Sequence, residues 1–300
     1  MGDGEQITVA VDGLSVLAPA KINLSLLIAG KRPDGFHDIE TLMAKVTWYD
    51  EILIEPGRRP GIELICKGPH WAPTGRDNLV YRAAEALLDD CGSKAQLRVT
   101  LTKNIPAGTG LGSASSDAAA TLIGLNHYLK LRCGRRKLSE LAAALGSDVA
   151  FFLNGPLAFC TGKGEKVEKI DDNFDFLALL ILSDISVSTK EVYANYKHDR
   201  VVYEKLTVKI NGHLKEKRID LAAGMCANML QGSCFDLTGS LAELKNKVES
   251  LNIGPCSLSG SGSAMFSIIE NGDEEVARRW KHTLEKETGC KSVIVRNNRW

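Results

Sequence analysis

Short apolar runs and segments with helically spaced apolar residues follow one another along the 300 residues of this chain. In the first half, runs rich in β-branched and aromatic residues predict strands at residues 7–16, 21–29, 45–54, 62–66 and 96–102. Apolar residues three and four positions apart predict helices at residues 77–90, 116–131 and 137–145. Because most of these strands precede the helices and do not alternate strictly with them, we expect an α+β fold.

A second set of elements follows a charged stretch. The sequence GEKVEKIDDN at 164–173 leads into the apolar run FLALLIL at 176–182, which predicts a buried strand and is too short to span a bilayer. Helices are then predicted at residues 189–196, 221–230 and 239–249, and strands at 256–258, 263–269 and 291–295. We therefore expect two domains, residues 1–165 and 166–300, a division that also fits the chain length.

The composition is that of an ordinary globular protein, with 44% hydrophobic and 25% charged residues. Lys and Arg together number 37, as do Asp and Glu, so no overall basic field would attract nucleic acid or an anionic membrane. The N-terminal segment has neither the basic and apolar regions of a secretory signal nor the composition of a transit peptide. We expect a cytoplasmic protein whose partner is a small molecule, and the sequence leaves its oligomeric state open.

The eight cysteines form no recognisable pattern. The sequence contains no Cys-x-x-Cys pair and no spaced quartet of Cys and His, so neither a disulfide framework nor a zinc site is indicated. We expect small buried thiols in a reducing compartment, because free cysteine is commonly buried.

The segment PAGTGLGSASSDAAA, residues 106–120, joins a predicted strand to a predicted helix. A helix N-terminus favours an anion through its free N–H groups and its dipole, and glycines let a phosphate approach the backbone. The alternative is a tight turn in which the glycines only supply positive φ angles. No Lys follows Gly112, as a Walker A loop would require, and the next segment is basic and helical, unlike a dinucleotide-binding fold. The spacing favours another kind of phosphate loop.

Four further segments stand in order around this glycine loop. They read PAKINL at 19–24, GKRPDGFHDIETL at 30–42, LGSDVAFF at 145–152 with GKGE at 162–165, and LSGSGS at 258–263. Together, over roughly residues 15–270, the five segments resemble the GHMP kinase superfamily and, within it, the family of 4-diphosphocytidyl-2-C-methyl-D-erythritol kinases. The chain departs from the usual residues of that family at Ser113 and Ala114, which replace Gly-Gly, at Phe36, which replaces Tyr, and at Ala150, which replaces Pro.

The resemblance implies a two-domain GHMP kinase fold with the active site in the cleft between the domains. It also implies an enzyme that uses ATP and Mg²⁺ to phosphorylate the 2-hydroxyl of 4-diphosphocytidyl-2-C-methyl-D-erythritol in the non-mevalonate isoprenoid pathway. The alternatives are another GHMP kinase, similar to homoserine or mevalonate kinase, and a non-catalytic nucleotide-binding protein. No acidic cluster is clearly reserved for the metal, so its ligands are unknown.

The resemblance also assigns two catalytic residues. Asp148 is the expected general base on the accepting hydroxyl, and Lys21 is the expected cation beside it, which would keep the carboxylate ionised and stabilise developing negative charge. Without the motif, Asp148 would be interpreted as a helix N-cap and Lys21 as a surface lysine on a strand.

The remaining expected site residues bind ATP or the cytidyl substrate. The expected ATP phosphate site comprises Pro106, Ala107, Gly108, Thr109, Gly110, Leu111, Gly112, Ser113, Ala114, Ser115 and Ser116, with Lys103 and Asn78 near the nucleoside. The expected substrate contacts are Asn23, Phe36, His37, Tyr193, Gly260 and Gly262. In this scheme Phe36 and Tyr193 stack on the cytosine and His37 forms a hydrogen bond with it. The alternatives are a solvated strand end for Lys103, a core-anchored loop aromatic for Phe36 and a tight hairpin for the last two glycines.

Overall fold

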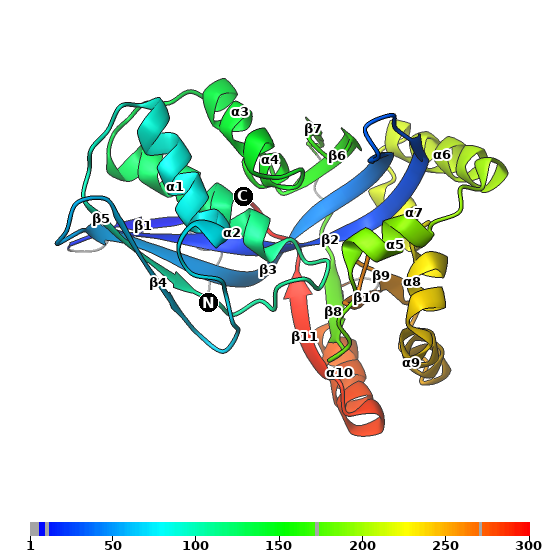
Figure 1. Cartoon of the computed structure of the whole chain (residues 1–300). Coiled ribbons are helices and arrows are strands. Elements are labelled where there is room, and N and C mark those ends of the chain that lie inside the picture. The colour runs from blue at the N-terminus through cyan, green and yellow to red at the C-terminus, as the bar shows by residue number, and fades with distance from the viewer. Residues whose placement is uncertain (1–5, 10–11, 172–173, 270–271) are drawn as a thin grey trace.

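The computed structural model describes residues 6–9, 12–171, 174–269 and 272–300, and in these the chain forms two β-sheets covered by helices (Figure 1). Among the described residues, the first sheet has seven strands and the second has four. Nearly all strand pairs are antiparallel, the exception being β4 with β5. The predicted α+β class is confirmed.

The first sheet is built from the N-terminal half of the chain. Its strands are β1 (Ile7–Val9), β2 (Leu14–Lys31), β3 (His37–Pro56), β4 (Ile62–Lys67), β5 (Leu97–Thr102), β6 (Leu157–Gly162) and β7 (Lys166–Lys169). The strand order is β1-β2-β3-β5-β4, and β6 pairs with the outer half of β3 and with β7.

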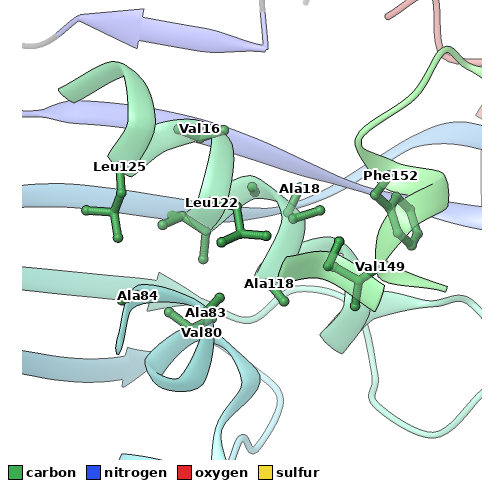
Figure 2. Packing of buried hydrophobic residues seen from close by; sticks show 14 of the residues in the cluster. Val16, Ala18, Val80, Ala83, Ala84, Ala118, Leu122, Leu125, Val149 and Phe152 are labelled. Atoms are coloured by element: carbon green, nitrogen blue, oxygen red, sulfur yellow. The ribbon is translucent and has the colours of Figure 1, made fainter. Parts of the chain in front are cut away.

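Helices cover one face of this sheet (Figure 1). They are α1 (Leu79–Asp90), which follows the 3₁₀ turn η1 (Gly75–Asp77), α2 (Ser113–Tyr128), α3 (Arg135–Leu145) and α4 (Val149–Phe152). Figure 2 shows how alanines and aliphatic side chains of α1, α2 and β2 fill the space between the helices and the sheet. A Cβ atom at Gly124 of α2 would lie 2.7 Å from Ile54 Cδ1, so this helix packs closer to the sheet than a larger residue would allow.

The second sheet and its helices come from the C-terminal half. Its strands are β8 (Leu177–Leu182), β9 (Ser257–Leu258), β10 (Met265–Ile269) and β11 (Lys291–Arg296), in the order β11-β8-β10-β9. The helices are α5 (Thr189–Asn195), α6 (Arg200–Lys215), α7 (Ile219–Gly224), α8 (Gln231–Leu237), α9 (Gly239–Ser250) and α10 (Glu274–Thr288).

The long hairpin formed by β2 and β3 joins the two halves. In Figure 1 it runs out of the first sheet and ends beside α6 of the second half. Leu26 of β2 accepts a hydrogen bond from Met229 N at 2.9 Å and donates one to Ala227 O at 2.7 Å. Ile22 packs in the same apolar cluster as Phe266 of the second sheet. The predicted domain boundary at 165/166 stays a prediction. Along the chain, β7 is the last strand of the first sheet and β8 is the first strand of the second sheet.

Several predicted elements needed correction. The predicted strand at 7–16, of which residues 10–11 lie outside the described residues, is two strands, because the chain bends at residues 12–13 between β1 and β2. The predicted helix at 221–230 is wrong beyond Gly224: Cys226 has a φ of +46°, and the following residues bond to β2. Helices α6, α8 and α10 and strands β6 and β7 were not predicted.

The cysteines are less buried than expected. All eight are free thiols, as the sequence predicted, but Cys91 is exposed and only three of the eight are buried. The sulfur atoms of Cys91 and Cys133 lie 3.3 Å apart, after the C-terminal ends of α1 and α2. In addition, no helix in the described parts of the chain is both long and apolar enough to cross a membrane.

Candidate active site

The glycine loop lies between β5 and α2 and is held in place from two sides. From the N-terminal sheet, Lys21 N donates to Leu111 O at 2.9 Å. From the C-terminal half, Ala264 N donates to Thr109 O at 3.0 Å and Ser259 Oγ donates to Gly110 O at 2.8 Å. Because both halves of the chain contribute these bonds, the loop is part of their junction.

The three alternating glycines of the loop all have positive φ angles, +74° at Gly108, +80° at Gly110 and +70° at Gly112. A Cβ atom at Gly110 would overlap the carbonyl oxygen of Ser259, and one at Gly112 would lie 2.9 Å from Lys21 Cγ. A Cβ atom at Gly108 would meet nothing within 4 Å. Two of the glycines are therefore required by packing against protein, and the backbone of Gly108 is the one left open to a ligand.

Helix α2 begins three residues earlier than expected, at Ser113, with Gly112 as its N-cap. The Ser113 hydroxyl is buried and donates to Asp50 Oδ2 at 2.8 Å. Ser116 is also buried, and its hydroxyl has no hydrogen-bond partner in the described part of the chain. Ser115 is half-buried and Ala114 is exposed, so these two residues form the accessible side of the first turn.

The two residues expected near the nucleoside have other partners here. Lys103 is buried, and its ammonium group contacts Asp50 Oδ2 at 2.6 Å as well as Asp117 and Ser113. The solvated strand end considered for Lys103 is therefore wrong. Asn78 caps α1, since its Oδ1 accepts from Val80 N at 2.9 Å, and its Nδ2 donates to a backbone carbonyl. Nucleoside contacts of Lys103 and Asn78 stay predictions.

The structure brings together the two residues expected to be catalytic, Lys21 of β2 and Asp148 just before α4. Lys21 Nζ lies 3.8 Å from Asp148 Oδ2. The side chain of Lys21 is almost fully buried, so the surface-lysine interpretation is wrong, and burial lowers the pKa of its ammonium group while the charge of Asp148 raises it. Asp148 occupies the N-cap position of α4 but makes no capping hydrogen bond with its side chain, which is 32% exposed. Its carboxylate therefore faces Lys21 and the solvent-accessible side of the site.

Asn23 connects this pair to the C-terminal glycine motif. Its Oδ1 accepts a hydrogen bond from Lys21 Nζ, and its Nδ2 donates to Thr41 Oγ1 at 2.8 Å. Its backbone N donates to Ser259 Oγ at 3.3 Å. Lys21 and Asn23 are two positions apart on β2, so they point to the same face of the sheet. Sequence reasoning did not identify Ser259, although it lies within the LSGSGS motif.

Gly260 and Gly262 also pack against the loop region. Their φ angles are +60° and +95°, and a Cβ atom at Gly260 would lie 3.4 Å from Gly110 Cα. Asn228 Nδ2 donates to Gly260 O at 2.8 Å, a contact that the sequence did not indicate. The expected contact of these glycines with a substrate diphosphate stays a prediction.

The aromatic residues expected to bind a base lie at the tip of the β2–β3 hairpin and on α5. The His37 and Tyr193 rings are 5.3 Å apart at an angle of 35°. Phe36 is 59% exposed, and Lys163 Nζ lies 4.7 Å from its ring centre. Because the Phe36 ring is exposed, the alternative of a loop aromatic anchored in the core is wrong. Stacking of a base between Phe36 and Tyr193 stays a prediction.

Burial and nearby charges shift the pKa values of His37 and Tyr193 in this aromatic group. Burial and the neighbouring Lys31 lower the pKa of His37, which favours the neutral imidazole at neutral pH. Burial and the charge of Asp148 raise the pKa of Tyr193, so its hydroxyl stays protonated. Asp148 therefore lies close enough to Tyr193 for its charge to act on the hydroxyl.

Within the described residues, no group of three or more His, Cys, Asp or Glu side chains is arranged to hold a metal ion. Mg²⁺ in phosphate-transferring enzymes is commonly bound by one or two carboxylates together with the phosphates. Such a metal would be bound chiefly by the phosphates, and the described residues offer no carboxylate cluster that would hold it without them.

Comparison with known proteins identifies relatives over most of the chain. Two family models match, the GHMP kinases N terminal domain at residues 78–156 and the GHMP kinases C terminal domain at residues 212–286. The 4-diphosphocytidyl-2-C-methyl-D-erythritol kinase of Syntrophus aciditrophicus (strain SB) is 38% identical over 269 residues, which are 87% of this chain and 91% of the relative.

Solved structures agree with these matches. A crystal structure of a 4-(cytidine 5'-diphospho)-2C-methyl-D-erythritol kinase has a TM-score of 0.75 at 30% identity, covering 95% of this chain and 100% of the other. A homoserine kinase from Cytophaga hutchinsonii has the same TM-score, 0.75, at 18% identity, covering 99% of this chain and 98% of the other. At 18% identity the likeness concerns the fold alone.

Proposed function

The chain belongs to the GHMP kinases and, within them, to the family of 4-diphosphocytidyl-2-C-methyl-D-erythritol kinases, and we propose that it transfers the γ-phosphoryl group of ATP to the 2-hydroxyl of that cytidyl substrate. The observation that carries this proposal is the meeting of Lys21, Asp148 and the glycine loop at the junction of the two halves. Phosphoryl transfer needs a donor and an acceptor held in line, and groups that stabilise charge, more than it needs covalent chemistry from the protein.

In the proposed mechanism Asp148 is the general base. An aliphatic hydroxyl is a poor nucleophile, and a carboxylate within hydrogen-bond reach can take its proton as the new P–O bond forms. The bond between the γ-phosphorus and the bridging oxygen of ATP breaks in the same step, and ADP leaves. The Lys21 ammonium, 3.8 Å from the Asp148 carboxylate, would stabilise negative charge on the transferring group.

The glycine loop would hold the ATP phosphates through its backbone. Ala107 and Gly108 are exposed, and the open side of Gly108 allows an oxygen to reach the backbone N–H groups. The first turn of α2, with Ser115 on its accessible side, adds the positive end of the helix dipole. Mg²⁺, when bound with ATP, would be held by the phosphates and would neutralise part of their charge.

The aromatic group supports a substrate that carries a base. Phe36 offers an exposed ring face, and the neutral His37 imidazole beside Tyr193 provides a hydrogen-bonding group at the same place. Homoserine and mevalonate contain no base, so a kinase for either substrate would not need this group. We place the activity in the cytoplasm, with small molecules as its partners and without nucleic acid or membranes.

A substrate panel tests the proposal. Formation of ADP is followed with the purified chain, ATP and Mg²⁺, and with the cytidyl substrate, homoserine, mevalonate or galactose as acceptor. Turnover only with the cytidyl substrate is the expected result. Turnover with homoserine or mevalonate alone would assign another GHMP activity, and ATP binding without ADP formation from any acceptor would indicate a non-catalytic nucleotide-binding protein.

A further inference from the structure

We propose that Asp50 is a positioning residue for the glycine loop, because its single buried carboxylate holds both the segment that enters the loop and the helix that leaves it. Asp50 lies in β3, 53 residues before Lys103, and no part of its side chain is exposed. The inference rests on the proposed function only in identifying the loop's ligand as the phosphates of ATP.

One oxygen of Asp50 fixes the start of the loop. Asp50 Oδ1 accepts hydrogen bonds from the backbone N–H of Asn104 at 2.6 Å and of Ile105 at 2.8 Å. Lys103 follows β5, and these two residues stand between Lys103 and Pro106. Two successive backbone donors on one oxygen determine the direction in which the chain leaves the sheet.

The other oxygen fixes the end of the loop. Asp50 Oδ2 accepts from Ser113 Oγ at 2.8 Å, and Ser113 is the first residue of α2. It also accepts from Lys103 Nζ at 2.6 Å, and the same ammonium group donates to Ser113 and to Asp117 in the next turn of α2. A carboxylate has about four acceptor positions, and the four donors here fill them.

The cluster below the loop contains two acids and one lysine. Asp50, Lys103 and Asp117 are all buried, so two carboxylates share one ammonium group. Burial raises the pKa of Asp117 well above its usual range, which favours its protonated form. A protonated Asp117 would reduce the competition between the two carboxyl groups for Lys103.

Ser113 contributes a side-chain contact to this arrangement. Its hydroxyl donates to Asp50, and a glycine at this position would supply no such donor. The first turn of α2 is thereby fixed to β3 through a side chain, and the loop between the two attachment points contains only residues 106–112. We infer that the accessible backbone of Gly108 takes its position from these bonds.

Asp50→Asn is the discriminating variant. It preserves size, but an amide has one acceptor oxygen and one donor nitrogen, so either the two backbone donors or the Ser113 and Lys103 donors face an N–H group. Glu55→Gln, on the same strand and half-buried, is the matched control. The Asp50→Asn variant is expected to keep the far-ultraviolet circular dichroism spectrum of the wild type.

Two measurements then test the positioning role. Hydrogen exchange of the ligand-free protein is expected to accelerate about tenfold or more for the backbone amides of residues 104–116 and little elsewhere. The Kd for a non-hydrolysable ATP analogue, measured by calorimetry, is expected to rise about tenfold or more. The KM for the cytidyl substrate is expected to change by less than about threefold, because only the loop moves.

An unchanged Kd for the ATP analogue in the folded variant would overturn the inference, as would an equal loss of affinity for both substrates, which indicates general destabilisation. If Asp50→Asn does not fold, Ser113→Ala removes one of the four bonds and is expected to raise the Kd for the analogue about threefold or more. An unchanged Kd in Ser113→Ala would then overturn the inference. Exchange and analogue binding require no turnover, so a wild-type enzyme without kinase activity would refute the proposed function and leave this test valid.

Discussion

The hydroxyl of Ser259 donates a hydrogen bond to the carbonyl oxygen of Gly110 at 2.8 Å, across 149 residues of sequence. The contact joins the glycine loop of the N-terminal half to the glycine motif of the C-terminal half. Since Asn23, two residues from Lys21, donates its backbone N–H to the same Ser259 hydroxyl, the catalytic strand is linked to this junction as well. The site therefore depends on the two halves keeping one relative position.

This contact predicts different effects for two glycine substitutions. Gly110→Ala places a Cβ atom against the Ser259 carbonyl, so we expect a clear loss of thermal stability together with a loss of activity. Gly108→Ala meets no neighbouring atom, and its cost is the strain of a positive φ angle, on the order of 1 kcal/mol. For Gly108→Ala we expect weaker ATP binding in a protein that melts only slightly earlier. Equal melting temperatures and equal ATP affinities of the two variants would contradict this distinction.

Asp148→Asn tests the proposed general base. The amide keeps the size of the side chain but cannot accept the proton, so kcat should fall roughly 10²-fold or more. The melting temperature should change little, because the side chain is partly exposed and makes no capping bond to α4. Asp89→Asn, an exposed position near the end of α1, is the control and should retain wild-type kinetics. A kcat within a few-fold of wild type would leave Asp148 with only a structural role.

Phe36→Ala tests the proposed base pocket. Stacking of a base on an aromatic ring contributes about 1–3 kcal/mol, so the KM for the cytidyl substrate should rise roughly 5- to 150-fold, with little change in the KM for ATP. Phe36→Tyr, which preserves the ring face, is the matched control and should be close to neutral. Steady-state kinetics of both variants, with each substrate varied in turn, gives the KM for ATP and the KM for the cytidyl substrate. If the KM for ATP rises in Phe36→Ala and the KM for the cytidyl substrate does not, Phe36 belongs to the ATP site and the proposed base pocket is wrong.

Lys45 predicts a pH dependence of stability that is separate from catalysis. It lies buried in β3, donates to the carbonyl oxygens of Phe152 and Asn154, and burial lowers its pKa to about 7. In the unfolded chain its pKa is about 10.4, so between these values the unfolded state binds one proton more than the folded state. The free energy of unfolding should therefore rise with pH in this window, by up to about 1.4 kcal/mol per pH unit.

Lys45→Met removes that contribution. Denaturant unfolding of the wild type and the variant at about pH 7 and about pH 8.5 should show a gain with pH that is about 1–2 kcal/mol larger in the wild type. The window ends below pH 9 because burial raises the pKa values of Cys160 and Cys256 to about 12, and such thiols lower stability as pH increases further. Parallel pH dependences of the two proteins would refute the titration of Lys45.

The sequence predicted those helices and strands in which the pattern of apolar and polar residues matches the pattern of buried and exposed positions. Strand β5 was predicted at 96–102 and extends over Leu97–Thr102, with four of its six residues buried. Strands β2 and β3 were predicted too short. Residues 17–20 were left out of β2 because Pro19 is unusual inside a strand, and residues 37–44, which begin with the polar pair His37 and Asp38, were left out of β3. The strand partners of these segments are distant in sequence, so no local signal compensates. Helix α6 was missed because Ile210 is its only fully buried residue.

The sequence predicted which residues belong to the candidate site better than it predicted the contacts between them. The motifs indicated Lys21 and Asp148, and the structure places them 3.8 Å apart although 127 positions separate them in the sequence. The sequence did not show that Gly110 faces protein, because that depends on the Ser259 carbonyl. It also did not identify Asp50, since a single carboxylate within a strand has no distinctive pattern until its four donors are known.

The most direct test of the central claim is ³¹P nuclear magnetic resonance of the reaction products of ATP, Mg²⁺ and the cytidyl substrate with the wild-type enzyme. The account predicts one new phosphomonoester signal, assigned to the carbon that bears the 2-hydroxyl by its coupling pattern, formed in equal amount with ADP and with the substrate diphosphate intact. The Asp148→Asn enzyme should form the same product roughly 10²-fold more slowly. No phosphomonoester, or phosphorylation of a different hydroxyl, would contradict the assignment of this site.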